Sequence, residues 1–425
     1  MLVATQSWGV SLINDTETER VLHKLIKPLG YAADIPDGRL DIHIINADDF
    51  NAFVAGGEDI YVYTGLLKTI KSPNALQAVV AHEMGHMIGG HTAQMSKRMD
   101  AEMKRAMLIQ ALGVGLMVAG GNPSLGAGVL AGSTGIARQS IMAFTRDEER
   151  IADDLGLDLM IKAKLNPNGF IDVFEQMQEI TGAMEAKINP HQINHPLTTE
   201  RLNNVKNKIT QSKKTYTENK QLTDTQNQEY ELVRAKLIGY LDSPSHVREI
   251  YPESNKSDAA LYARAISDMQ IGNLTDALTG VKILISRQPQ NPYFYELMGD
   301  IEYQFGHYDT SVDAYKKSLE LAGNAPQIQT ALALVLTERN KPGDQSYAIE
   351  LCKRSLLTEH APLTYWVLAR AYGDHDAGRS NWAMAEYYKM LNKDKEAKKF
   401  AKNAQKKLKK SDAEYIKSDD ILKHK

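Results

Sequence analysis

The chain has 425 residues, of which 43% are hydrophobic, and its formal net charge is -3. This length and composition exclude an intrinsically disordered protein and predict two or three domains of ordinary size. The near-neutral charge gives no overall attraction to nucleic acid or to an anionic membrane. The single cysteine, Cys352, excludes an intrachain disulfide and a cysteine-based zinc cluster, so a metal site would need histidine and carboxylate ligands.

The beginning of the chain predicts a mixed α and β unit. Residues 16–29 have the apolar spacing of an amphipathic helix, and residues 40–45 and 60–63 have the composition of strands. Gly56 and Gly57 permit a tight turn before the second strand.

Two helices further along carry residues with metal-binding chemistry. Residues 74–92 predict an apolar helix that starts at Asn74 and holds several histidines. Residues 146–164 predict a helix with an acidic first turn. Between them, residues 106–137 contain no charged side chain, but glycine and proline near the middle leave two halves that are short for a membrane span of about 20 residues. A small-residue helical hairpin is one interpretation of this segment, and a lid or a membrane-touching patch is the other.

Beyond Asp258 the pattern changes to repeated pairs of helices. Gly272 and Gly306 lie 34 positions apart, and aligning them places Ala277 over Ser311. This period is typical of tetratricopeptide repeats, which stack into a solenoid whose concave face binds peptide or protein segments.

His82-Glu83-Met84-Gly85-His86 is an H-E-x-x-H motif inside a predicted helix. Residues four apart differ by about 40° around a helix, so both imidazoles can reach one ion. Glu83 lies about 100° from His82 and flanks the ion, where it can take a proton from the attacking water. A catalytic zinc site uses three protein ligands and keeps an open position, so the motif requires one more ligand.

Two residues compete for the place of the third ligand. His91 would suit a metzincin, but that motif puts its third histidine at the position of Thr92. In a continuous helix His91 lies about 140° from His86, which favours a structural or surface role. Glu149 is the better candidate, because Asp153 lies one turn further on the same face and can hold the free N–H of a ligating histidine.

These segments resemble the M48 family of zinc metallopeptidases, the gluzincins, over about residues 10–205. The resemblance rests on the H-E-x-x-H motif and on Glu149-Arg150-Ile151-Ala152-Asp153, with Asn51-Ala52-Phe53 and Gly65-Leu66-Leu67 as further matches. With its repeats, the chain is similar to BepA-type periplasmic peptidases, which act in outer-membrane protein quality control.

The resemblance implies a set of site residues. One Zn2+ per chain would be held by His82, His86 and Glu149, with Glu83 as the base and with Asp153 and Arg201 supporting the ligands. His195 would steady the oxyanion or cap the resting site, and a plain loop histidine near a proline turn is the alternative. Asn51 and the strand Ile60-Tyr61-Val62-Tyr63 are expected to line the cleft edge and receive the substrate backbone as an added strand. A plain edge strand of a small sheet is the equal alternative.

The predicted fold is mostly α. It consists of an α+β zincin-like peptidase domain with a small sheet at residues 1–205, with a lid or plug at 106–137, then a helical linker at 206–257, an all-α tetratricopeptide solenoid at 258–410 and a tail at 411–425.

The predicted function is zinc-dependent cleavage of protein substrates in cell-envelope quality control. The repeats would recruit substrates or a protein partner, with outer-membrane assembly machinery as the expected class. A repeat-based chaperone or binding protein with a closed, gated metal site is the alternative. A structural zinc site is disfavoured because Glu83 would then have no role.

The predicted location is the periplasm. Met1 to Val10 lack the features of a secretory signal, so this location requires a trimmed signal, and a cytoplasmic location is less favoured. No transmembrane span is expected. The lysine-rich end beyond Lys393 predicts a solvated outer face of the last repeat and no nucleic-acid partner.

Overall fold

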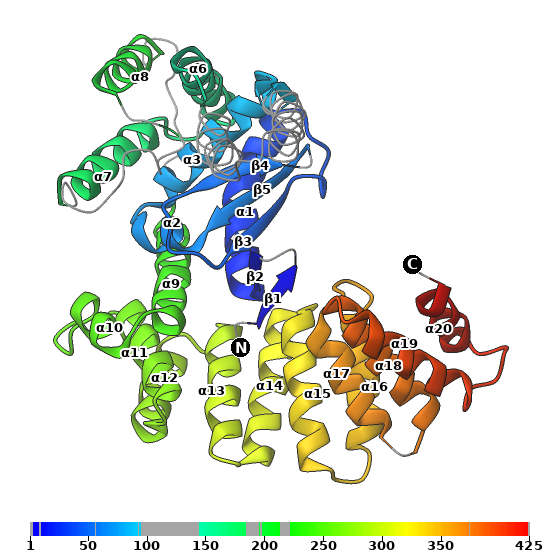
Figure 1. The fold of residues 1–425 in the computed structure, drawn as a ribbon. Helices are drawn as coiled ribbons and strands as arrows, with labels where there is room; N and C mark the ends of the chain where they lie inside the picture. Colours follow the sequence, from blue (N-terminus) through cyan, green and yellow to red (C-terminus); the bar gives the residue numbers. More distant parts are fainter. Residues whose placement is uncertain are drawn as a thin grey trace, which may run out of the picture. The chain divides into compact units, whose positions relative to one another are not determined.

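The structure is a computed structural model in which two compact units are distinguished. It is mostly helical with one small sheet, which confirms the predicted fold class (Figure 1). The motif unit comprises residues 22–43 and 47–230, and the repeat unit comprises residues 1–21, 44–46 and 231–425. The residues described are 3–7, 10–55, 57–91, 93–94, 144–183, 195, 198–212, 222–373 and 375–423.

The predicted domain boundaries stay predictions. Residues 1–21, which the sequence pattern assigns to the peptidase domain, belong to the repeat unit by their contacts. The predicted lid or plug at 106–137 lies outside the described residues. Among the residues that are described, no helix combines the length and the apolar character needed to cross a membrane.

The sheet has the strand order β1-β2-β3-β5-β4. Predicted strands 40–45 and 60–63 correspond to β3 and β5, whereas no sequence pattern predicts β4, a short strand with two alanines. β4 and β5 form an antiparallel hairpin with Ala52 opposite Val62, and β2 pairs antiparallel with β1 and with the end of β3. The strands are β1 (Val3–Ser7), β2 (Val10–Asn14), β3 (Asp41–Ile45), β4 (Ala52–Ala55) and β5 (Asp59–Tyr63).

Helices α3 and α6 of the motif unit approach each other at backbone distance. A Cβ atom added to Gly85 on α3 would lie 2.3 Å from the carbonyl oxygen of Ala152 on α6. One added to Gly156 would lie 2.8 Å from the carbonyl oxygen of Ala81. Only glycine at these two positions lets the helices pack this closely. The helices up to the repeats are α1 (Thr16–Ala32), α2 (Thr64–Thr69), α3 (Pro73–Ile88), α6 (Arg146–Lys162), α7 (Gly169–Ala183) and α8 (Thr199–Ser212).

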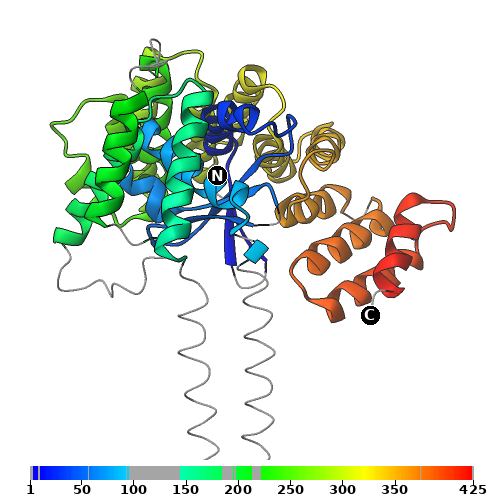
Figure 2. The same cartoon turned by 90° about the horizontal axis from the view of Figure 1, so that it is seen from above.

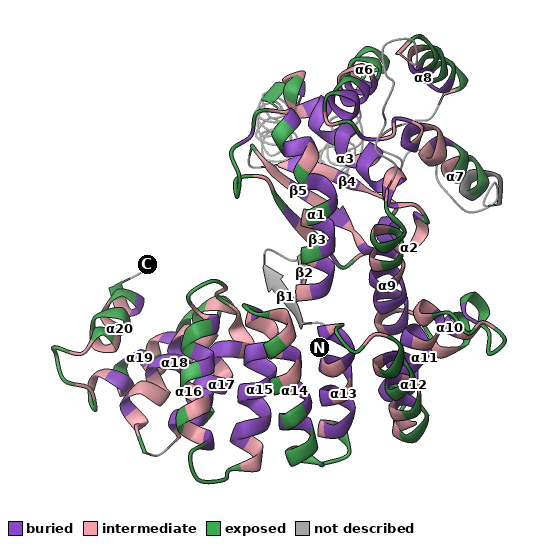
Figure 3. Cartoon of the chain, turned by 180° about the vertical axis from the view of Figure 1, so that it is seen from behind, coloured by how far each residue is buried: buried purple, intermediate pink, exposed green. Residues whose placement is uncertain are grey.

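The helices of the repeat unit follow one another in pairs, and those from α13 onward are seen in yellow to red in Figures 1 and 2. Figure 3 shows α15 buried along most of its length. The helices are α9 (Asp224–Leu241), which begins in the motif unit, α10 (Pro244–Ile250), α11 (Asp258–Gln270), α12 (Leu274–Arg287), α13 (Pro292–Gln304), α14 (Tyr308–Ala322), α15 (Pro326–Arg339), α16 (Asp344–Ser355), α17 (Pro362–Tyr372), α18 (Ala377–Met390), α19 (Asp394–Gln405) and α20 (Ala413–Lys423).

In each of the first four repeat pairs, a residue with a positive φ angle lies one or two positions after the first helix. Gly272 and Gly306 have φ angles of 79° and 78°, and Asn340 and Gly373 take the same place in the next pairs with φ of 51° and 48°. Asparagine is one of the few side chains that tolerates this conformation. The 34-residue period predicted from two glycines therefore continues through Asn340.

Lys236 on α9 is a cation buried among carboxylates, with an exposed fraction of 2%. Its Nζ lies 2.6 Å from Asp15 Oδ1, 3.3 Å from Glu17 Oε2 and 3.5 Å from Glu296 Oε2. Burial raises the pKa of Glu17 to about 7, although Lys236 opposes that shift. The hydroxyl of Tyr262 donates to Glu17 at 2.8 Å. These contacts bind the connection between β2 and α1 to α9, α11 and α13.

The same connection also contacts later repeats. Asn14 Nδ2 donates to Glu359 Oε1 at 2.5 Å, and Thr16 donates to Gln327. Gln327 in turn donates to the other oxygen of Glu359 at 2.6 Å. The connection is thus held by residues spread from α9 to the turn after α16.

Replacing Lys236 with methionine is expected to lower the free energy of unfolding by about 3–5 kcal/mol, because three carboxylates lose their buried cation. Without the ammonium group, the pKa values of these carboxyl groups rise in the folded chain. A carboxyl group whose pKa is raised in the folded chain favours folding when it is protonated at low pH, and this contribution is lost as pH rises through the folded-state pKa. The loss of unfolding free energy in the variant should therefore be larger at about pH 8 than at about pH 5. Urea denaturation at both pH values measures it.

Lys282→Met is the matched control, since Lys282 is exposed on α12 in the same unit. It should change stability by no more than about 0.5 kcal/mol. An equal loss in both variants, or a deficit at Lys236 that does not depend on pH, would contradict the role of Lys236 as a buried counter-ion.

Candidate functional site

Helix α3 supplies the two histidines of the H-E-x-x-H motif. It starts after Ser72, whose side chain accepts a hydrogen bond from the backbone N–H of Asn74, so the cap lies two residues before the predicted start. His82 and His86 are buried, and their Nε2 atoms lie 3.1 Å apart. One helical turn therefore points both imidazoles at a single position.

Helix α6 brings Glu149 to the same position. Thr145 caps this helix in a capping box with Glu148, which places Glu149 in the first turn. Glu149 Oε1 lies 3.4 Å from His86 Nε2, and Glu149 Oε2 lies 3.5 Å from His82 Nε2. The side chain can reach that far because α3 and α6 pack at backbone distance.

His195 supplies a fourth donor atom. Its Nδ1 lies 2.8 Å from Glu149 Oε1 and 3.3 Å from His82 Nε2, and its Nε2 lies 3.3 Å from Glu83 Oε1. One donor atom from each of His82, His86, Glu149 and His195 lies within 4.8 Å of the others. Among the predicted site residues, Glu83 lies beside this cluster and contributes no atom to it.

The donor cluster fits zinc. Bonds of about 2.0–2.1 Å from a tetrahedral zinc to its ligands put the ligand atoms about 3.3 Å apart, close to the separations seen here. The donors are three imidazole nitrogens and one carboxylate oxygen, a set that suits zinc. The single thiol, Cys352, is buried in the repeat unit and takes no part.

Asp153 and Arg201 hold the ligands from behind. Asp153 Oδ1 lies 2.9 Å from His82 Nδ1, which leaves His82 Nε2 to face the cluster. Arg201 on α8 donates Nε to Asp153 at 2.7 Å and places Nη1 2.7 Å from Glu149 Oε2. The guanidinium therefore fixes both carboxylates, a connection that the sequence pattern does not reveal.

His91 and Phe144 also contact a ligand. The ring of Phe144 stacks on His86 with centroids 3.8 Å apart, and His91 Nδ1 lies 3.1 Å from His86 Nδ1. The expectation that His91 faces elsewhere assumed a helix continuing to Thr92, but α3 ends at Ile88 and Gly90 has a φ of 72°. After that turn His91 contacts His86 but contributes no atom to the donor cluster. Its position therefore does not support the metzincin alternative. Gly89 and Gly90 are the feature of the sequence that indicates the end of the helix before His91.

Burial and the partner groups set the protonation of the ligands. Burial lowers the pKa of His86 to about 3, so its imidazole is neutral. Burial raises the pKa of Glu149, but hydrogen bonds from His195, His82 and His86 outweigh it and hold the pKa well below the usual range. Burial lowers the pKa of His82, whereas Asp153 and Glu149 raise it to about 10. A cation is thus favoured at His82 Nε2, where a metal would replace a proton.

The edge of the described sheet beside His82 and Glu83 is formed by β4 and not by β5. The prediction that Ile60-Tyr61-Val62-Tyr63 is the edge strand is wrong, because β5 lies between β3 and β4 in the sheet. Asn51 and Ala52, at the start of β4, line a cavity of about 70 Å3 beside His82 and Glu83.

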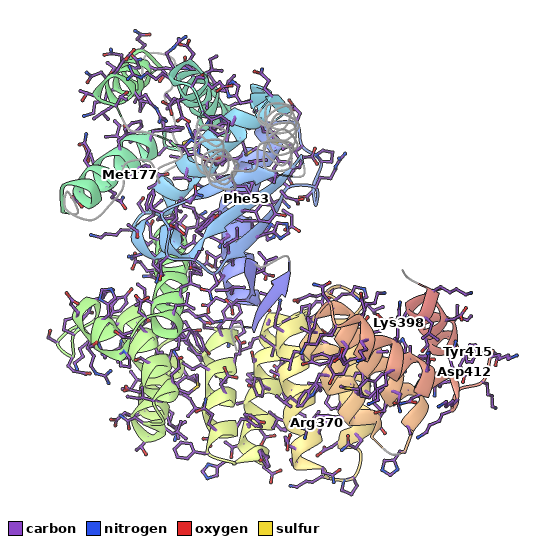
Figure 4. All side chains as sticks on the ribbon, in the orientation of Figure 1. Phe53, Met177, Arg370, Lys398, Asp412 and Tyr415 are labelled. Carbon is purple, nitrogen blue, oxygen red and sulfur yellow. The ribbon has the colours of Figure 1, made fainter. Side chains whose placement is uncertain are left out.

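Helix α7 forms the apolar wall of this cavity. Phe170, Val173, Phe174 and Met177 all line it, and none of them is singled out by a sequence motif. Figure 4 labels Met177 on α7 and Phe53, which neighbours Ala52 on β4. The same cavity is lined by five further predicted site residues, namely His82, Glu83, Asp153, His195 and Arg201.

Comparison with known proteins gives one family and several relatives. Residues 14–209 match Peptidase family M48. The Beta-barrel assembly-enhancing protease of Escherichia coli K12 is 23% identical over 340 residues, covering 78% of this chain and 67% of that protein. Metalloprotease YcaL of the same strain is 28% identical over 193 residues, covering 45% of this chain and 70% of that protein. Mitochondrial metalloendopeptidase OMA1 of Schizosaccharomyces pombe is 29% identical over 189 residues, covering 44% of this chain and 50% of that protein.

Solved structures resemble the chain only weakly. Yeast Tom70 covers 84% of this chain and 85% of its own at 10% identity, with a TM-score of 0.31. A thermophilic tetratricopeptide repeat protein of Thermus thermophilus covers 46% and 94% at 18% identity, with a TM-score of 0.27. The repeat architecture therefore rests on the helices of this chain alone.

Asp153→Asn is expected to weaken zinc binding by about 10–100-fold, because the amide no longer fixes His82 and no longer pairs with Arg201 as a charge. Competition with a chromophoric chelator measures the affinity. Asp154→Asn is the matched control, since Asp154 is half-exposed and faces Lys208 instead of the cluster. Equal affinities for all three proteins would show that Asp153 does not support the metal.

Proposed function

We propose that residues 14–209, a domain of Peptidase family M48, cleave peptide bonds with one zinc ion held by His82, His86 and Glu149. The family makes the chain a zinc-dependent metalloendopeptidase that acts on polypeptides, and the roles of its individual residues are the proposal. The observation that carries these roles is the cluster of four donor atoms within 4.8 Å, with the Glu83 carboxylate beside it. A structural zinc site would leave this buried carboxylate without a role.

Glu83 is the proton carrier of the proposed reaction. Zinc, when bound, polarises the scissile carbonyl and lowers the pKa of water. Burial raises the pKa of Glu83, which makes the carboxylate a stronger base. Its oxygen takes a proton from the attacking water as the water oxygen bonds to the carbonyl carbon, and gives that proton to the leaving nitrogen as the C–N bond breaks.

His195 closes the site at rest. Its two ring nitrogens lie close to Glu149, His82 and Glu83, which is where substrate and water must enter. A catalytic zinc site needs one open position, so His195 has to move away before cleavage. This geometry favours a cap over the oxyanion role. A cap at His195 is also what the alternative of a repeat-based chaperone with a closed metal site would require. The relatives named as proteases do not favour that alternative.

The substrate is proposed to bind along β4. This strand is last in the order of the described sheet, so its outer backbone groups can pair with an extended peptide. The cavity behind Ala52 would then take a large apolar side chain of that peptide, since Phe170, Phe174 and Met177 line it. This arrangement suits unfolded polypeptides, whose backbone and apolar side chains are both accessible.

The setting is proposed to be the cell envelope. The support is the resemblance, over 78% of the chain, to a protein named for enhancing β-barrel assembly. We place the enzyme in the periplasm, with the repeats recruiting substrates or outer-membrane assembly proteins. Residues Asn14 to Glu17 contact the repeats from α9 to the turn after α16, so partners are expected to bind surfaces that this segment leaves exposed.

Glu83→Gln is expected to retain zinc and to lose about 100- to 10,000-fold in the rate of casein cleavage, because the amide cannot accept the proton. Metal analysis and a cleavage assay on the same preparation measure both. Glu179→Gln, an exposed change on α7, is the control and should cleave normally. Cleavage by Glu83→Gln at the rate of the unmodified chain would exclude Glu83 as the base.

His195→Ala is expected to keep one zinc per chain and to raise the cleavage rate by about tenfold or more, because the closed state is no longer populated. His23→Ala, a half-exposed histidine on α1, is the control. A fall in rate with zinc retained would assign His195 to the oxyanion instead. Loss of zinc would make it an essential ligand.

A further inference from the structure

The end of the repeat unit carries a dense patch of lysines. Between residues 393 and 410 there are nine lysines, two carboxylates and no arginine, in a chain whose net charge is -3. Figure 4 labels Lys398 in this part of the solenoid. The lysine patch consists of Lys393, Lys395, Lys398, Lys399, Lys402, Lys406, Lys407, Lys409 and Lys410.

Three lysines of α19 and Lys406, which directly follows the helix, form one stripe opposite its buried side. Positions 395, 399, 402 and 406 are spaced by four, three and four residues, which keeps them on one face. The opposite face is buried against the solenoid through Ala397, Ala401 and Ala404, none more than 1% exposed. The stripe therefore points to solvent along the length of the helix, and Lys407, Lys409 and Lys410 extend it into the following turn.

These ammonium groups are free to meet an outside partner. Eight of the nine lysines are exposed, and Lys398 is intermediate. Across the described residues, no carboxylate lies within ion-pairing distance of any of the nine. The nearby Asp412 accepts a hydrogen bond from the backbone N–H of Lys409 and so stabilises the turn instead of neutralising a lysine.

We propose that the lysine patch docks the protein onto a bilayer surface containing anionic phospholipids. Clusters of four to eight basic residues on an amphipathic helix are the usual electrostatic signature of such binding. Ile416, on the neighbouring helix α20, is 57% exposed and next to Lys417, and it offers an apolar contact with the interface. Docking would leave the enzyme peripheral and reversibly bound. It goes beyond the peptidase proposal and does not depend on it.

The chemistry of the patch favours lipid over nucleic acid. Sequence-reading and phosphate-clamping surfaces use arginine forks and exposed aromatic rings, and the patch has no arginine. The aromatic residue of α19, Phe400, is stacked on Tyr388 with centroids 5.3 Å apart. Lysine is a compact, mobile point charge, which suits a fluid array of headgroups better than a fixed array of acceptors.

The test is co-sedimentation of the full chain with vesicles. Binding is expected to vesicles of phosphatidylglycerol and phosphatidylcholine in equal amounts, and not to phosphatidylcholine alone. It should disappear at about 1 M salt, where the screening length is about 3 Å. The triple substitution K395Q, K399Q and K402Q should weaken binding about a hundredfold, because each lysine near an anionic surface contributes several-fold.

The matched control removes the same charge elsewhere on the repeats. K256Q, K282Q and K316Q together alter exposed lysines on other helices or turns, and this variant should bind vesicles like the unmodified chain. Circular dichroism melting of both triple variants checks that folding is intact. The salt and lipid dependence of the unmodified chain tests the proposal even if a variant fails to fold.

Three outcomes would overturn the proposal. One is binding that does not depend on phosphatidylglycerol. Another is equal weakening by the two triple variants, which would reduce the effect to net charge. The third is binding of duplex DNA, at the same salt, tighter than binding of the anionic vesicles, which would assign the patch to nucleic acid.

Discussion

The backbone contact between α3 and α6 is the constraint on which the proposed metal centre depends. Gly85 and Gly156 leave the two helices without intervening side chains, and the carbonyl oxygens of Ala152 and Ala81 occupy the places where Cβ atoms would be. A carboxylate side chain is short, so Glu149 can share a metal with the motif histidines only if its helix lies this near. Gly85 is therefore as much a part of the site as the residues that would touch zinc.

Charge balance then decides which groups can surround a cation. The buried carboxylates of Glu149 and Asp153 are offset by one guanidinium, Arg201, which pairs with both oxygens of Asp153 and leaves Glu149 Oε1 facing the donor cluster. His86 is kept neutral by burial, and Asp153 holds a proton on the outer nitrogen of His82. The centre thus offers a carboxylate and imidazole nitrogens to a bound dication, and the guanidinium lies on the outer side of the carboxylates.

The sequence predicts features whose residues lie close together along the chain. His82 and His86 share one helix, so spacing alone brings them together, and Glu149 could be paired with them through Asp153 one turn away. The path of the chain after Gly90, the position of β4 at the sheet edge and the wall built by α7 depend on contacts between distant segments. No local period encodes such contacts. The repeats can be predicted from the sequence, because a turn residue with a positive φ angle recurs in successive pairs of helices.

The connection between β2 and α1 implies an unusual order of assembly. Asn14 and one of its hydrogen-bond partners, Glu359, lie 345 positions apart in the chain. The carboxylates near it meet their counter-ion, Lys236, only once α9 exists. Contacts between residues so far apart in the chain close late and slowly. The segment Asn14 to Glu17 must therefore stay undocked until most of the solenoid has been synthesised, and its docking marks a late stage of folding.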